Sequence, residues 1–220
     1  MNEEVRKVTI AQMHGPVLLP DSPYRMWLEG TLDDYLHVPD GSRVEIIDGE
    51  IVVSVAPGVP HAYIAETICK AVYRREFENP GYPWRALQGP QLDFMAWEDG
   101  YIPDIMLLDH DLLKDAVEAR SARLVPDQAE VIVEITSQGN ARRDRPGKGT
   151  GKWCAYARAE VPYYLLVDLD PKVAATTLYS IPDAASAAYL HEEVWPFGEA
   201  IALPDPLNLR IPTDTWLPWD

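Results

Sequence analysis

The sequence predicts a mixed α/β fold, with a central mixed sheet flanked by helices, an N-terminal hairpin and C-terminal strands. Three strand-like runs, "LQGPQLDFMAW", "YIPDIMLLD" and "AEVIVEIT", are separated by turns and by the helical-looking "DLLKDAVEAR". A glycine-bearing loop then leads into "KWCAYARA", a second helical run, and on to the strand "YYLLVDLD". This order of strand, helix and strand predicts one sheet covered by helices.

The N-terminal part contains an arm and then a hairpin. Residues 1–30 mix Pro, Gly and scattered apolar residues without a sustained period, so we expect an arm there and a single domain over 31–220. Thr31 is placed to cap a short helix, "LDDYLHV". The run "RVEIIDGEIVVSVAP" predicts a hairpin that turns at Asp48 and Gly49.

The strongest helix signal lies between His61 and Phe77. Apolar residues recur there at helical spacing, and Pro60 stands just ahead of them, as is typical of a helix start. Near the C-terminus, the runs "ATTLYSI", "HEEVWPF" and "LRIP" predict further strands or edge hairpins. These runs complete the mixed α/β pattern.

Length and composition exclude several classes of protein. A chain of 220 residues with 47% hydrophobic and 25% charged residues is not disordered or fibrous, and it is long enough for one large domain. Neither a signal peptide nor a membrane-spanning run is present, so we expect a cytosolic protein. Cys69 and Cys154 belong to no metal or disulfide pattern and are expected to be buried free thiols.

The net charge of −16 limits the kind of nucleic-acid site that the chain can form. Phosphate contacts need Lys or Arg, so a broad basic surface is excluded and any such site must be local. A divalent cation at the site would offset part of the repulsion between acidic side chains and phosphate.

One carboxylate interrupts the apolar run "AEVIVEIT". At the two-residue period of a strand, Val131, Val133 and Ile135 share one face, while Glu134 lies on the other. A lone ionised carboxylate buried in such a strand costs roughly several kcal/mol unless it is paired, protonated or bound to a cation. The sequence must therefore supply a partner for Glu134.

A second carboxylate, on another predicted strand, also lies beside apolar residues and also needs a partner. Asp104 follows Pro103 and opens the apolar run "DIMLL". Two carboxylates that meet at one sheet edge supply oxygen ligands for Mg²⁺ or Mn²⁺, which keeps several waters and binds substrate phosphate oxygens. Lys152, at the start of "KWCAYARA", could orient an attacking water or neutralise charge developing on phosphorus.

Each of these three residues also has a structural alternative. Asp104 could form a turn after proline, and Glu134 could pair with Arg142 or Arg143, which follow closely along the chain. Lys152 could be a solvated lysine at a helix start. The sequence alone leaves these alternatives open.

Together, the motifs "PD", "EIT" and a Lys-bearing helix resemble the PD-(D/E)xK nuclease superfamily. More narrowly, "EIIDGEIVVSVAPGVPH", "YIPDIMLL", "VIVEITS", "RRD" and "KWCAYARAEVPYYLLVD" resemble the Uma-two family of bacterial restriction endonucleases, over roughly residues 31–215. The resemblance implies a restriction-endonuclease-like sheet flanked by helices, a divalent metal between Asp104 and Glu134, and phosphodiester hydrolysis.

The chain departs from the family pattern in the loop before the lysine helix. The family spaces D-x-x-x-K-x-x-x-Y without interruption, whereas this chain reads "DRPGKGTGKWCAY". Lys148 keeps the distance from Asp144, and Lys152 keeps the distance to Tyr156. We favour Lys152, because it would lie one helical turn from Tyr156, while Lys148 lies among glycines.

The resemblance also adds supporting residues. Glu45 matches an acidic position of the family's first hairpin and could be a further ligand, or simply an exposed strand residue. His61 matches a family position and could contact phosphate or a metal-bound water, or lie at the surface. Arg142, Arg143 and Arg145 are the basic cluster nearest the expected metal and are the candidate phosphate contacts.

These observations lead to one main hypothesis and two alternatives. The main hypothesis is a cytosolic endonuclease that uses Mg²⁺ or Mn²⁺ to hydrolyse nucleic acid, with DNA the expected substrate. One alternative is a non-catalytic binding or assembly module that retains the nuclease fold; another is hydrolysis of a small phosphoester at the same site. A homodimer would suit an antiparallel duplex, by analogy with the fold.

Overall fold

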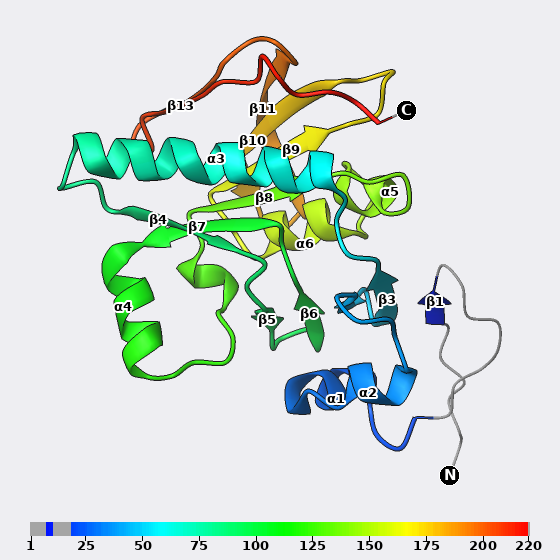
Figure 1. Cartoon of the computed structure of the whole chain (residues 1–220). Helices are drawn as coiled ribbons and strands as arrows, with labels where there is room; N and C mark the ends of the chain where they lie inside the picture. The colour runs from blue at the N-terminus through cyan, green and yellow to red at the C-terminus, as the bar shows by residue number, and fades with distance from the viewer. Residues whose placement is uncertain (1–7, 11–18, 220) are drawn as a thin grey trace.

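The computed structural model describes residues 8–10 and 19–219, which form two β-sheets with helices around them (Figure 1). The larger sheet has six strands, in the order β11-β10-β9-β8-β7-β4, and the second has five, in the order β1-β3-β2-β6-β5. A separate pair, β12-β13, lies near the C-terminus. The predicted mixed α/β class, with a multi-strand sheet flanked by helices, is confirmed.

The bounds of the strands follow the sequence patterns closely in the second half of the chain. The larger sheet contains β4 (Trp84–Gln88), β7 (Ile105–Asp109), β8 (Val131–Ile135), β9 (Tyr163–Asp168), β10 (Ala175–Asp183) and β11 (Ala188–Pro196). The second sheet contains β1 (Val8–Ile10), β2 (Arg43–Ile47), β3 (Glu50–Ser54), β5 (Leu92–Phe94) and β6 (Asp99–Tyr101). The C-terminal pair is β12 (Ile201–Leu203) and β13 (Leu209–Ile211).

Strands β8 and β9 are parallel neighbours, with Glu134 opposite Leu166. A parallel pair needs a crossover connection, and here the connection carries the helices α5 (Ala141–Asp144) and α6 (Lys152–Arg158). The predicted order of strand, helix and strand is therefore confirmed. The crossover brings the start of α6 back toward the end of β8, where Glu134 lies.

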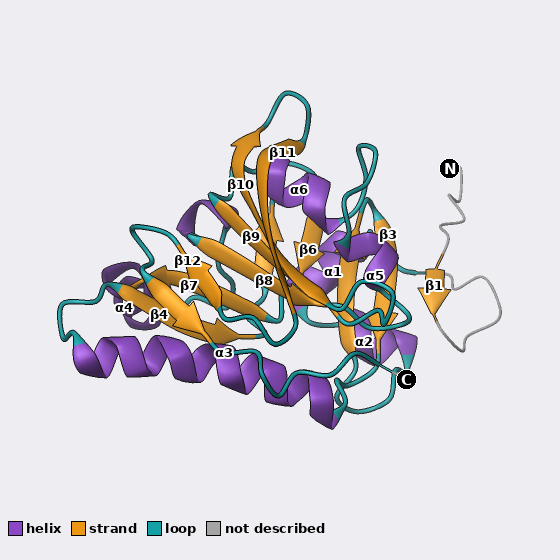
Figure 2. Ribbon diagram, turned by 90° about the horizontal axis from the view of Figure 1, so that it is seen from above, coloured by secondary structure: helices purple, strands orange, loops and turns teal. Residues whose placement is uncertain are grey.

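The helices cover both faces of the larger sheet (Figure 2). On one face, Ile68 and Val72 of α3 (Val59–Glu78) pack in the same core as Val133 of β8. On the other face, Tyr156 of α6 packs in the same core as Ile132. The alternation of side chains along β8 thus divides the apolar residues between two cores, as the two-residue period predicts.

The N-terminal region contains a helix that the sequence pattern did not predict. In α1 (Pro23–Glu29), Met26 and Trp27 are each only 3% exposed, and the helix contacts β2 and β6. Of the predicted arm, residues 1–7 and 11–18 lie outside the described residues. The division into an arm over 1–30 and a domain over 31–220 stays a prediction.

The hairpin and the short helix after residue 30 form as predicted. The hairpin joins β2 to β3 through Asp48 and Gly49, whose φ angles of 53° and 72° match a turn that favours Asp-Gly. Thr31 is the N-cap of α2 (Leu32–Leu36), but its hydroxyl donates to Met26 O (3.3 Å) and does not cap the helix.

The run "YIPDIMLLD" is two strands, and the prediction of a single strand was wrong. Its first residue, Tyr101, is the last residue of β6, in the second sheet, and its last five residues are β7, in the larger sheet. Between them, the N–H of Ile102 donates to Glu45 Oε1 (2.7 Å), and Pro103 has no N–H to donate to a ladder. Asp104 therefore lies where the chain passes from one sheet to the other.

Within the described residues, the remaining helical elements are α4 (His110–Glu118) and the 3₁₀ turn Pro126–Gln128. The first corresponds to the predicted run "DLLKDAVEAR". No helix in residues 8–10 and 19–219 is both long and apolar enough to cross a membrane.

Replacement of Gly100 by Ala should destabilise the fold. A Cβ at Gly100 would lie 2.6 Å from the ring of Trp27, whose indole N–H donates to Val44 O (2.9 Å). We expect Gly100→Ala to lower the free energy of unfolding by about 1–3 kcal/mol in urea denaturation, because the packed ring must move.

Gly81→Ala is the matched control for this prediction. A Cβ there would meet only Asn79 Oδ1 at an ordinary 3.5 Å. An equal loss of stability in both variants would contradict the assignment of the effect to the contact with Trp27.

Candidate active site

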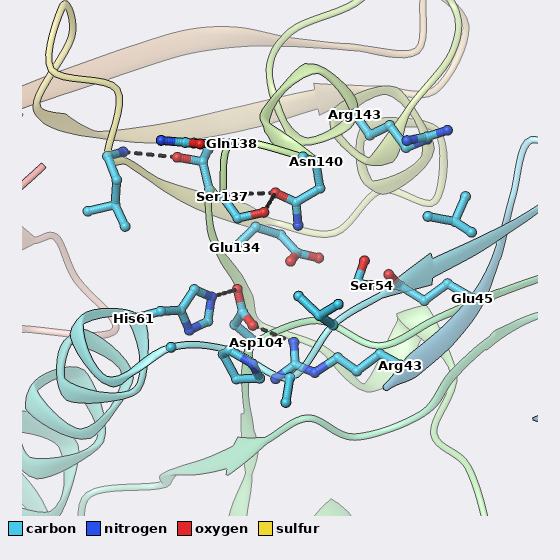
Figure 3. A pocket seen from close by; sticks show the side chains of 18 of the residues that line it. Arg43, Glu45, Ser54, His61, Asp104, Glu134, Ser137, Gln138, Asn140 and Arg143 are labelled. Carbon is cyan, nitrogen blue, oxygen red and sulfur yellow. Dashed lines mark hydrogen bonds and ion pairs between the residues drawn. The ribbon is translucent and has the colours of Figure 1, made fainter. Parts of the chain in front are cut away.

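A cavity of about 510 Å³ lies where the two sheets meet, and most of the predicted site residues line it (Figure 3). It is lined by residues of β2 and β3, of the start of α3, of the end of β8 and the loop after it, and of the start of α6. Its charged and imidazole side chains are Arg43, Glu45, His61, Asp104, Glu134, Arg143 and Lys152.

Asp104 is held by three donors at the wall of this cavity. Its Oδ2 accepts from the N–H of Ile135 (2.8 Å) and lies 3.1 Å from His61 Nε2, while Arg43 donates to Oδ1. His61 and Arg43 approach the carboxylate from two sides in Figure 3. Burial alone would raise the pKa of Asp104, but His61 and Arg43 outweigh it and lower the pKa, so the group is ionised.

Glu134 finds its partner in the first turn of α6. Its Oε1 accepts from Lys152 Nζ (2.9 Å) and from the hydroxyl of Tyr156 (2.7 Å). Burial, together with the neighbouring Asp104 and Glu45, raises its pKa to about 7, although Lys152 opposes that rise. The structural alternative named Arg142 or Arg143 as the partner, and the structure gives Lys152 instead.

Lys152 is 3% exposed and joins two carboxylates from different sheets. Its Nζ lies 2.8 Å from Glu45 Oε1 and 2.9 Å from Glu134 Oε1. Burial alone would lower its pKa, but the surrounding carboxylates outweigh burial and raise the pKa. Lys152 is therefore not a solvated lysine, whereas Lys148 is exposed and does not line the cavity.

The backbone before Lys152 is fixed by a glycine. Gly151 has a φ of 87°, and a Cβ there would lie 2.7 Å from Arg143 O. Its N–H donates to Asp48 Oδ2 (2.7 Å), which ties the start of α6 to the hairpin turn. This position needs glycine both for its backbone angle and for the close approach.

Glu45 is 3% exposed and is not the exposed strand residue that the alternative described. Its Oε1 accepts both the Ile102 N–H and the ammonium of Lys152. It lies on the cavity wall beside Asp104 and Glu134. Three carboxylates thus share the cavity with one buried ammonium.

The basic cluster predicted for phosphate divides in the structure. Arg143 lines the cavity and lies 3.9 Å from Glu50 Oε2. Arg145 donates to both oxygens of Asp168 (2.7 and 2.8 Å) and lies outside the cavity lining. Arg142 is exposed and also lies outside the lining.

The sequence pattern did not identify Arg43 as a site residue, and it used Asp144, which lies outside the cavity lining, only to measure the spacing to the lysine. Arg43 reaches Asp104 from β2, and no local pattern connects these two positions in the sequence. Asp144, on α5, is fully buried, and neither of its oxygens has a hydrogen-bond partner among the described residues. Burial foremost, and then Glu134, raises the pKa of Asp144 well above its usual range. The pattern D-x-x-x-K, which begins at Asp144, was the sequence signal that could have identified this residue as part of the site.

Comparison with known families identifies the chain. A model of the Uma2 family, described as "Putative restriction endonuclease", matches residues 32–214. The chain belongs to the Uma2 family. No curated protein matches it.

One solved structure similar to this Uma2 protein is the crystal structure of a "putative nuclease belonging to DUF820" from Anabaena variabilis. The two chains are 15% identical, with a TM-score of 0.56, and the match covers 84% of this chain and 97% of the other. At this identity, the likeness shows the fold alone.

The donor set of the Uma2 site suits a hard divalent cation. Asp104 and Glu134 offer carboxylate oxygens to one cavity, and Mg²⁺ typically takes one or two protein carboxylates and completes its shell with water and phosphate. Among residues 8–10 and 19–219, no group of three or more His, Cys, Asp or Glu side chains is arranged so that it could hold a metal ion, so these two carboxylates would need water or substrate oxygens as further ligands. A bound ion would compete with Arg43 and His61 for the oxygens of Asp104.

Lys152→Met should destabilise the metal-free protein. The substitution leaves Glu45 and Glu134 buried without their shared ammonium, so we expect the free energy of unfolding at pH 8 to fall by about 3 kcal/mol. Chemical denaturation in a chelating buffer measures the change. Lys148→Met is the matched control, and an equal effect of both substitutions would contradict the assignment of Lys152.

Glu134 should make the stability of the metal-free protein depend on pH. Because its pKa rises from 4.5 to about 7 on folding, the folded state keeps a proton that the unfolded state releases between these values. Its contribution to stability is therefore lost as pH rises through this range, at a slope of up to about 1.4 kcal/mol per pH unit. Glu134→Gln should reduce that slope in denaturation series; parallel curves for the two proteins would contradict the raised pKa.

Proposed function

We propose that this Uma2 protein is a divalent-metal-dependent endonuclease that hydrolyses phosphodiester bonds of nucleic acid, with DNA as the expected substrate and the bacterial cytosol as its location. The observation that carries the proposal is the meeting of Asp104, Glu134 and Lys152 in one cavity. These are the residue types that the PD-(D/E)xK pattern requires, and they come from the residue just before β7, from β8 and from the start of α6.

Asp104 and Glu134 would hold the metal in this proposal. Mg²⁺ or Mn²⁺ bound there would lower the pKa of a bound water and polarise the phosphoryl oxygens. Asp104 is already ionised in the absence of a cation, because Arg43 and His61 stabilise its charge. Glu134 is the carboxylate that would have to lose a proton near neutral pH before it could bind a cation.

Lys152 has the role of a positioned ammonium in this mechanism. Its raised pKa keeps it protonated at neutral pH, so it can donate a hydrogen bond to water or to a phosphoryl oxygen but cannot act as the base. Glu45 contacts the ammonium of Lys152 from the side opposite Glu134 and so fixes its direction. The hydroxyl of Tyr156 donates to the carboxylate of Glu134 and so holds that carboxylate in place. These partners hold the ammonium in place before substrate arrives.

The substrate contacts are assigned by position at the cavity. Arg143 lines the cavity at its wall and is the first candidate for a phosphate contact. Arg142 is exposed nearby in the chain and could add a second contact. Arg145 would first have to break its ion pairs with Asp168 and Asp170, so we assign it a structural role.

Calorimetric titration of Mn²⁺ and Mg²⁺ is the first test of the proposal. Asp104→Asn and Glu134→Gln preserve size but remove one ligand charge each, so each should weaken binding by about 10–100-fold or abolish it. Asp111→Asn, at an exposed carboxylate on α4, is the matched control and should bind as the wild type does.

Cleavage assays complete the test. Plasmid DNA, single-stranded DNA, RNA and a model phosphodiester are incubated with each metal, and the wild type should cleave at least one nucleic acid. Asp104→Asn, Glu134→Gln and Lys152→Met should each lose about 100-fold or more in rate. Full activity in the carboxylate variants would overturn the assignment, and cleavage of the small phosphodiester alone would give a different substrate class.

A specific observation also favours a second function, that of a non-catalytic binding module. Arg43 and Lys152 already neutralise the cavity carboxylates without a cation, and the net charge of the chain is −16. Such a module would bind its partner in the presence of a chelator. The same titration separates the two functions, because the module would show no metal binding and no cleavage.

A further inference from the structure

The outer face of α3 carries a regular stripe of exposed side chains. Its members recur at alternating spacings of four and three residues, so at about 100° per residue they lie on one side of the helix. We refer to them as the outer stripe: Val59, Tyr63, Glu66, Lys70, Tyr73 and Phe77. The opposite side of the helix buries Ile64, Ile68 and Val72 against the larger sheet.

The outer stripe is more apolar than a solvent-facing helix surface requires. Val59 is 82% exposed and Phe77 is 89% exposed, with the two half-exposed tyrosines between them. In Figure 2, α3 lies along the edge of the molecule with the larger sheet on one side, and in Figure 1 it crosses in front of that sheet; in both views no described element covers its outer side. The outer stripe is thus apolar or aromatic toward both of its ends and charged at its centre, where Glu66 and Lys70 lie, and the sheet covers only the opposite face of the helix.

The order of residues along the outer stripe is symmetric about position 68. Val59 and Phe77 each lie nine positions from Ile68, one before it and one after it. Tyr63 and Tyr73 each lie five positions away, and Glu66 and Lys70 each lie two positions away. When the helix is turned end over end about position 68, each apolar residue of the stripe therefore takes the place of the other apolar residue, each tyrosine that of the other tyrosine, and Glu66 that of Lys70.

This symmetry gives charge and shape complementarity to an antiparallel copy of the same helix. If two α3 helices cross near position 68, Val59 of each copy faces Phe77 of the other, and the tyrosines face one another. Glu66 of each copy then faces Lys70 of the other, so the dimer would contain two Glu–Lys ion pairs between the copies. An isologous interface has this property, because the same patch must fit itself about a two-fold axis.

We propose that the outer stripe of α3 is the surface through which two copies of this chain associate, antiparallel and about a two-fold axis near Ile68. A different partner protein would need an apolar face, but it would not need this mirrored order of charges. The hydroxyl of Tyr63 is hydrogen-bonded to Thr215 Oγ1 (3.0 Å), so its side chain is already restricted before two copies associate.

No residue of the outer stripe lines the cavity. His61 contacts Asp104 and lines the cavity, and it projects from the side of α3 that faces the body of the protein. The inference therefore does not depend on metal binding or on nuclease activity. Association measured on the full chain tests it separately from the proposed function.

Sedimentation equilibrium of the full chain, at about 1–100 μM, is the first experiment. We expect a reversible dimer for the wild type, and Phe77→Glu should raise its dissociation constant by at least about tenfold. Val117→Glu is the matched control, since Val117 is 67% exposed on α4, outside the stripe, and it should leave the dimer unchanged. Circular dichroism melting checks that both variants fold.

Charge exchange then tests the antiparallel register. Glu66→Lys alone or Lys70→Glu alone places like charges opposite each other twice in the dimer, so each should raise the dissociation constant about tenfold. The double variant Glu66→Lys/Lys70→Glu restores opposite charges and should return to within about threefold of the wild type. An equimolar mixture of the two single variants should form mixed dimers for the same reason.

Several results would overturn the proposal. A wild type that is monomeric throughout the concentration range would do so, as would a dimer that Phe77→Glu does not weaken. A dimer that both single charge variants weaken but the double variant does not restore would show that the face is used without the antiparallel two-fold pairing, which also overturns it.

Discussion

The ammonium of Lys152 is the contact on which the cavity depends. It lies between Glu45 of the second sheet and Glu134 of the larger sheet, within hydrogen-bonding distance of both. Without it, two buried carboxylates would face each other in a medium of low dielectric constant, which is costly in free energy. Arg43 and Asp104 make a second link of the same kind between the sheets. Oppositely charged groups therefore join the two sheets at the cavity, beside an apolar core to which both sheets contribute, for example through Tyr101 and Ile132.

Hydrogen bonds of the hairpin turn between β2 and β3 hold these charged side chains in place. The carboxylate of Asp99 accepts the N–H groups of Asp48 (3.1 Å) and Gly49 (2.9 Å), which fixes the hairpin turn between β2 and β3. Asp48 in turn accepts the N–H of Gly151, the residue before Lys152. A chain of hydrogen bonds thus runs from β6 through the hairpin to the start of α6. The position of the ammonium depends on this chain as much as on its carboxylate partners.

The sequence located those parts of the site that local periodicity encodes. A carboxylate in an apolar strand is visible at a two-residue period, and this pattern found Glu134. Asp104 was found because it follows Pro103 and opens an apolar run, and the two residues line one cavity. Lys152 was preferred to Lys148 because of its helical distance to Tyr156, and both Lys152 and Tyr156 contact Glu134 in the structure. The mixed α/β class followed from the order of such patterns along the chain.

The parts that sequence reasoning missed depend on contacts between distant segments or on short elements. Arg43 reaches Asp104 across 61 positions, and only the folded arrangement of β2 and β7 brings the two together. The break between β6 and β7 depends on which sheet each half joins, and an apolar run does not encode that choice. Helix α1 has only seven residues, so its periodicity is weak, although Ser22, Pro23 and Gly30 at its ends are typical capping residues.

The loop before Lys152 has a consequence for how such a site can change in evolution. The loop is held at both ends, by the ion pair of Arg145 with Asp168 and by the bond of Gly151 to Asp48, while residues 146–150 between them are exposed. Residues inserted between these two anchors would lengthen an exposed loop, and the two anchors would still hold the start of α6 in place. The number of residues between Asp144 and the lysine can therefore differ between related chains. The number between the lysine and Tyr156 cannot, because one helix carries both. An alignment anchored on the helix would find the lysine, and one anchored on Asp144 would select an exposed residue of the loop.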